Sequence, residues 1–136
     1  MDSLVLVCVG GALGSMARYL IASWAASAWP TTIPLGTAIV NVVGSWLIAV
    51  VIDLSLRAGV LAPELRLFLA TGVAGGFTTY SAFNQEALAL LEDRAYWLAA
   101  AYVSGMVVLC LGAGLLGVMT ARLLVSAASF FGGGGR

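Results

Sequence analysis

The chain has 136 residues, of which 62% are hydrophobic and 9% are charged, and its mean hydropathy is +1.07. This composition excludes a soluble globular domain, because so few charged side chains cannot cover a water-exposed surface. Six arginines balance six acidic residues, and with a net charge of zero the chain lacks the basic surface that nucleic-acid binding requires.

Four apolar segments are long enough to cross a membrane, since about 20 residues of helix span the hydrocarbon core. They run over residues 4–28, 35–56, 65–91 and 96–121 and are joined by short loops. We therefore predict an all-α membrane protein with a single four-helix transmembrane domain over residues 1–126. A flexible glycine-rich tail is expected over residues 127–136.

The first and fourth predicted helices are rich in small residues. These are Gly10 and Gly14 in the first, and Gly105, Gly112, Gly114 and Gly117 in the fourth. Helices in lipid associate through small residues that let their backbones approach closely. Tight helix packing is the expected role of most of these glycines, and their density also indicates an oligomer.

In the second predicted helix, Thr37, Asn41 and Ser45 recur every four residues and therefore share one face. A polar side chain at membrane depth is costly unless it finds a partner. The amide of Asn41 offers both donors and an acceptor. Its spacing leaves two interpretations open: a hydrogen bond between helices, or the lining of an ion pathway.

The third predicted helix contains "GVAGGFTTYSAF", residues 72–83. The glycines and threonines predict a break near the middle of the helix, which would free backbone carbonyls to coordinate a hard cation such as Na⁺. After the break, Tyr80, Phe83 and Glu86 follow at steps of three residues, so the positive edges of two rings could face a small anion. An aromatic packing stripe beside a glycine hinge remains the alternative.

Three motifs resemble the small dimeric fluoride channel family (Fluc/CrcB). They are "GGALGSMARY" in the first helix, "GTAIVNVVGSW" in the second and "GVAGGFTTYSAFNQE" in the third. The resemblance implies an antiparallel, dual-topology dimer in the bacterial cell membrane. It implies passive, fluoride-specific export that lowers cytoplasmic fluoride toxicity, with a structural Na⁺ at the dimer interface that is not transported.

The resemblance also implies the site residues. Backbone carbonyls of Gly75 and Thr78 would hold Na⁺, and the anion pathway would involve Thr37, Asn41, Tyr80, Phe83 and Tyr102, with Arg18 near the vestibule and Glu86 at an acidic position. The chain departs from the family at Tyr80, where phenylalanine is usual, and at Met106 and Cys110, where hydroxyl residues are usual. These departures leave a homodimer and a heterodimer with a paralogous subunit both open.

Two other functions compete with a fluoride channel. A small multidrug-type proton-coupled exporter also has four helices and forms a dimer, but it needs a carboxylate deep in its first helix, and residues 4–28 contain none. A non-conducting partner subunit of a heterodimeric channel is the second. An enzyme is not expected, because the chain has no histidine and no nucleophile–base pair at membrane depth.

Overall fold

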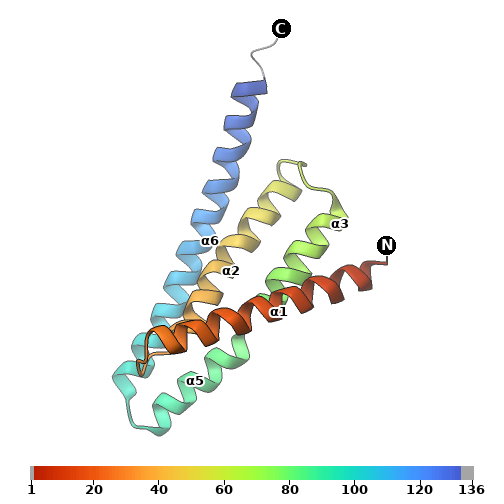
Figure 1. Cartoon of the computed structure of the whole chain (residues 1–136). Helices are drawn as coiled ribbons and strands as arrows, with labels where there is room; N and C mark the ends of the chain where they lie inside the picture. The colour runs from red at the N-terminus through yellow and green to blue at the C-terminus, as the bar shows by residue number, and fades with distance from the viewer. Residues whose placement is uncertain (1, 133–136) are drawn as a thin grey trace.

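The computed structural model describes residues 2–132, which fold as helices and turns without a strand in that range (Figure 1). The elements in chain order are α1 (Ser3–Ala28), α2 (Leu35–Leu56), α3 (Pro63–Arg66), the π-helix η1 (Leu67–Ala74), α4 (Gly75–Phe77), α5 (Tyr80–Glu92) and α6 (Tyr96–Gly132). The prediction of an all-α protein is therefore confirmed.

Three helices in the described range are long and apolar enough to cross a membrane: Ser3–Ala28, Leu35–Leu56 and Tyr96–Phe130. They make the chain a multi-pass membrane protein, as predicted. The third predicted helix is divided between the α3–η1–α4 segment and α5, and neither part is long enough to count as a span. Of the four predicted spans, three are thus supported by the structure.

Proline residues determine where the first helices end and begin. Helix α1 stops before Pro30, since the residue preceding a proline avoids the helical conformation, and Pro63 occupies the first turn of α3. The sequence prediction ended the fourth helix near Ala121, but α6 continues to Gly132. Residues 127–132 of the predicted tail are therefore helical, and residues 133–136 lie outside the described residues.

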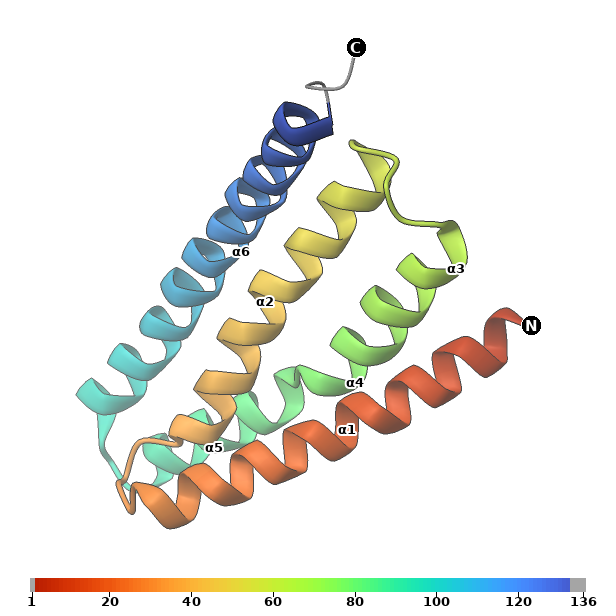
Figure 2. The ribbon, with the colours of Figure 1, turned by 45° about the horizontal axis from the view of Figure 1, so that its top comes forward.

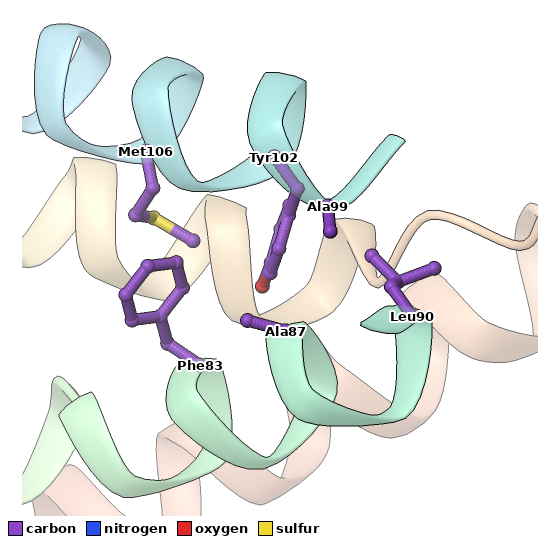
Figure 3. Packing of buried hydrophobic residues seen from close by; sticks show 6 residues of the cluster. All are labelled: Phe83, Ala87, Leu90, Ala99, Tyr102 and Met106. Carbon is purple, nitrogen blue, oxygen red and sulfur yellow. The ribbon is translucent and has the colours of Figure 1, made fainter. Parts of the chain in front are cut away.

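The helices form an open arrangement in which α6 lies along α2, while α1 packs against η1 and α4 (Figure 2). The α1–α2 loop and the α5–α6 turn lie at one end of the molecule, and the α2–α3 loop lies at the other (Figure 1). A small apolar core fills the space between α5 and α6 and consists of Phe83, Ala87, Leu90, Ala99, Tyr102 and Met106 (Figure 3).

Glycines bring α1 into backbone contact with η1 and α4. A Cβ on Gly10 would lie 2.7 Å from the carbonyl oxygen of Phe68, and one on Gly14 would overlap the carbonyl oxygen of Val73. In α6, a Cβ on Gly117 would lie 2.5 Å from the carbonyl oxygen of Trp46, whereas one on Gly105 would meet only open space within the described chain. Tight packing is confirmed for Gly10, Gly14 and Gly117.

Gly14→Ala is expected to destabilise the folded protein by about 1–3 kcal/mol, because the added methyl group must displace rigid backbone rather than a flexible side chain. Gly11→Ala is the matched control, since a Cβ at that position has no atom within 4 Å. Denaturant unfolding of both variants in detergent measures the difference. Equal stability of the two variants would show that α1 can move away from η1 without cost.

Candidate functional site

The break in the third helical region lies at Thr78 and Thr79. Both residues are extended, with φ and ψ of −80° and 157° for Thr78 and of −151° and 117° for Thr79. The predicted break is present, but it follows the glycines instead of coinciding with them. Gly72 and Gly76 are helical, and a Cβ on either would collide with the backbone of α1. These two glycines therefore serve helix packing.

Asn41 on α2 holds the broken backbone. Its Nδ2 donates a hydrogen bond to the carbonyl oxygen of Thr79 at 3.0 Å, and the backbone N–H of Thr79 donates to its Oδ1 at 2.8 Å. The side-chain amide thus replaces the helical hydrogen bonds that the break removes, which a buried backbone requires. Nδ2 also lies 3.9 Å from the Sδ of Met106, which is a weak acceptor.

The break changes the hydrogen bonding of two carbonyl groups that the sequence analysis singled out. The helical donor for the carbonyl of Gly75 is the N–H of Thr79, which binds Asn41 instead. The helical donor for the carbonyl of Thr78 is the N–H of Ala82, which binds the Oγ1 of Thr79 at 3.2 Å and so caps α5. Both carbonyl oxygens are the kind of ligand that a hard cation prefers.

Glu86 on α5 joins three helices through its carboxylate. Thr37 on α2 donates its hydroxyl hydrogen to Oε1 at 2.6 Å, and Tyr102 on α6 donates to Oε2 at 2.7 Å. Thr37 and Tyr102 are buried, and Glu86 is half-buried. The structure therefore brings together three residues that are far apart in sequence, with 65 positions between Thr37 and Tyr102.

The aromatic residues of the site differ in exposure. Phe83 is buried in the core between α5 and α6, where its ring faces Met106 and Tyr102 (Figure 3). Its ring centroid lies 5.7 Å from that of Tyr80 and 5.4 Å from that of Tyr102, and both pairs are tilted. Tyr80 is 77% exposed. One ring thus packs inside the chain, while the other projects from it.

An open cavity of about 350 Å³ lies beside the helix break. Its lining includes Asn41, Ser45, Thr78, Thr79, Tyr80, Phe83, Met106 and Cys110. Two further cavities, of about 210 and 190 Å³, reach Glu86 beside the α1–α2 loop and beside the C-terminal half of α5. The first cavity thus lies beside Asn41, and the other two lie beside Glu86.

Arg18 is a predicted site residue that lines none of these three cavities and makes no hydrogen bond to Asn41 or Glu86 in the described range. It is half-buried on α1, and the one ion pair seen within residues 2–132 joins Arg57 to Asp53. Sequence reasoning also missed Thr79 and the buried Asp53. A threonine immediately before the apolar pattern of α5 is a recognisable cap signal, and a carboxylate inside the second apolar segment was visible in the sequence.

Comparison with known proteins gives one consistent answer. Residues 5–118 match the family described as CrcB-like protein, Camphor Resistance (CrcB). A protein of Anaeromyxobacter sp. (strain K) named "Fluoride-specific ion channel FluC" is 52% identical over 91% of this chain and 98% of its own length. Proteins of the same name from Geobacter metallireducens and Sorangium cellulosum are 44% and 42% identical, over 91% and 87% of this chain and 100% and 93% of their own lengths.

Proposed function

The chain belongs to the CrcB-like family of ion channels, which are not enzymes, and on this basis we propose that it conducts fluoride passively out of the cell. One observation carries the proposal: the chain matches, almost from end to end, relatives that are named fluoride-specific channels. The fold agrees with this assignment, because the polar groups of the site lie between apolar helices rather than in an extramembrane domain.

The proposed anion pathway follows the cavities past Asn41, Phe83 and Glu86. A fluoride ion holds its water tightly, so a pore must offer donors in exchange, and it must bind the ion weakly enough to release it. Asn41 uses Nδ2 to bind Thr79, but its other contact is the weak acceptor Met106. An anion at this position can accept the Nδ2 hydrogen that points toward the Met106 sulfur. The two hydrogen bonds between Asn41 and Thr79 then stay intact.

The hydroxyl groups of Thr37 and Tyr102 extend this pathway. Both now donate to Glu86, at 2.6 and 2.7 Å. In the proposed mechanism each hydroxyl rotates from the carboxylate to a passing fluoride, while the carboxylate repels an anion that stays. Arg18 is proposed to attract anions at the mouth of the pathway, through its charge and without a direct contact with this group.

A dimer of antiparallel protomers completes the proposal. The exposed Tyr80 and the open space beside Gly105 leave apolar and aromatic surface that a second copy could cover. Carbonyl oxygens of Gly75 and Thr78 from each protomer would hold a structural Na⁺ between them. The diversion of their helical donors to Asn41 and to Thr79 supports this role. Bound there, Na⁺ would add positive charge near the cavity that contains Asn41, whose lining includes no arginine or lysine.

The Na⁺ proposal predicts that exchange of Na⁺ for a large organic cation lowers the dimer fraction of the purified protein about tenfold or more at a fixed concentration. Gly75→Ala is expected to act in the same direction. Within one chain its Cβ would lie 3.8 Å from the nearest atom, so the cost would arise at the interface. Cross-linking yield against protein concentration provides the measurement. A dimer fraction independent of Na⁺ would contradict the proposal.

The proposed activity is tested with liposomes that contain only this purified chain. Fluoride efflux is expected to follow the fluoride gradient without a proton gradient, while chloride efflux stays at the level of protein-free liposomes. Chloride is larger and is excluded by both pore width and donor spacing. Ion-selective electrodes measure both fluxes. Equal chloride efflux would contradict a fluoride channel, and a requirement for a proton gradient would instead favour a proton-coupled exporter.

A further inference from the structure

A buried charge lies outside the proposed ion pathway, near the end of α2. Asp53 is 5% exposed, and its Oδ1 lies 3.1 Å from the Nε of Arg57. The Arg57 side chain is 69% exposed. A buried carboxylate is costly unless it is paired. The ion pair uses Nε, so the N–H groups on the two terminal nitrogens of the guanidinium remain for another ligand.

The same residues line a cavity of about 340 Å³ between the ends of α2 and α6. Its lining consists of Asp53, Arg57, Ala58, Arg122, Val125 and Ser126. Arg122 is exposed, and within residues 2–132 it belongs to no ion pair. Two guanidinium groups against one carboxylate give the cavity a net charge of +1, and the hydroxyl of Ser126 adds a donor. The cavity therefore suits an anion.

The position of the cavity along the helices indicates the depth in the membrane at which a bound anion would lie. Arg57 follows the last residue of α2, and Arg122 lies about 39 Å along α6 from Tyr96 at 1.5 Å per residue. A bilayer with its headgroups is about 40–45 Å thick. With Tyr96 among the headgroups of one leaflet, the two arginines would lie among the headgroups of the other. On the membrane side of Arg122, α6 exposes Leu115, Leu116 and Met119, which lipid chains can contact.

We propose that this cavity binds a phosphate group, and that its source is the headgroup of an anionic phospholipid. Arg57 and Arg122 would each donate to phosphate oxygens, which planar guanidinium groups do well. Basic pockets between transmembrane helices are suited to anionic lipid headgroups. Asp53 acts as a positioning residue, because its bond to Nε holds the Arg57 side chain across the cavity. This site is independent of the ion that the chain conducts.

Native mass spectrometry of the full chain tests the proposal with phosphatidylglycerol, phosphatidylcholine and inorganic phosphate. We expect phosphatidylglycerol to be retained in preference to phosphatidylcholine. Arg57→Gln and Arg122→Gln should each lower its affinity about fivefold. Arg66→Gln is the matched control, because Arg66 lies on α3 at the same end of the molecule and does not line the cavity. An equal loss with Arg66→Gln would overturn the site in favour of general charge attraction.

Inorganic phosphate distinguishes the two possible sources of the ligand. If it competes only at concentrations far above those of the lipid, the headgroup is the ligand. If phosphate binds and phosphatidylglycerol does not, the lipid assignment is overturned. Binding of neither to the parent protein overturns the site itself.

The Asp53→Asn variant distinguishes a binding site of defined geometry from general attraction by positive charge. The substitution makes the cavity more positive, so attraction alone would strengthen phosphatidylglycerol binding. The proposed site predicts the opposite, a loss of about fivefold, because the neutral amide holds Arg57 less firmly than the carboxylate does. The helical content of the variant, measured by circular dichroism, must match that of the parent. Unchanged or tighter lipid binding by a correctly folded Asp53→Asn protein would overturn the positioning role of Asp53.

Discussion

Asn41→Asp is expected to reduce fluoride efflux to the background of protein-free liposomes. Aspartate can still accept the hydrogen bond from the N–H of Thr79, which Asn41 accepts at 2.8 Å. When ionised it cannot donate to the carbonyl oxygen of Thr79, nor can it offer a hydrogen to an anion in the cavity. The carboxylate also repels fluoride. The variant therefore removes the donor chemistry of the pathway and keeps the size of the side chain.

The loss of flux must be separated from a loss of folding. An unsatisfied buried carbonyl costs about 1–3 kcal/mol, so some destabilisation is expected. Efflux is therefore normalised to folded protein. Asn84→Asp is the matched control, since Asn84 is exposed on α5 and lines none of the three cavities of the proposed pathway. Normal efflux per folded Asn41→Asp protein would show that Asn41 only supports the helix break.

The sequence was sufficient to predict most helix boundaries, because apolar segments and prolines set them. The predicted second helix, 35–56, has the bounds of α2, and the first ends at Ala28 as α1 does. The end of α6 was missed. Residues 122–132 include helix formers without a proline or an early glycine, so the helix continues past the point at which about 20 residues have crossed the membrane.

The helix break was predicted from composition, but its position depends on tertiary contacts. Glycines favour a break in isolation, yet Gly72 and Gly76 remain helical because α1 packs directly on them. The break falls at Thr79 because two side chains compete with the helix for backbone hydrogen bonds: Asn41 from another helix, and the hydroxyl of Thr79 itself. The spacing of residues within one segment does not reveal a partner 38 positions away.

Only part of the candidate site could be predicted from the sequence, because spacing within one segment does not reveal contacts between helices. Helical spacing placed Thr37 and Asn41 on one face of α2. That Glu86 receives hydrogen bonds from both Thr37 and Tyr102 depends on how α2, α5 and α6 pack. The family resemblance named these residues without stating their contacts. The dimer and its Na⁺ depend on a second copy of the chain, so they remain proposals.

Phe83→Ile is expected to reduce fluoride efflux at least tenfold per folded protein, whereas Tyr80→Phe should keep it. Phe83 is buried beside the cavity and has no polar atom, so its contribution to an anion pathway must come from the positive edge of its ring. Isoleucine keeps apolar bulk and removes that edge. Tyr80→Phe retains the edge, and at a position that is 77% exposed it should change stability by no more than about 0.5 kcal/mol.

Phe77→Ile controls for packing in this comparison. Phe77 is also buried, three residues before Tyr80, but it does not line the cavity that holds Asn41. Both phenylalanine variants should lose stability, by about 1–3 kcal/mol. Only Phe83→Ile should lose flux per folded protein, because only that ring can face the ion. If both variants lose flux in proportion to their loss of stability, Phe83 acts as a packing residue and the aromatic-edge mechanism is wrong for this chain.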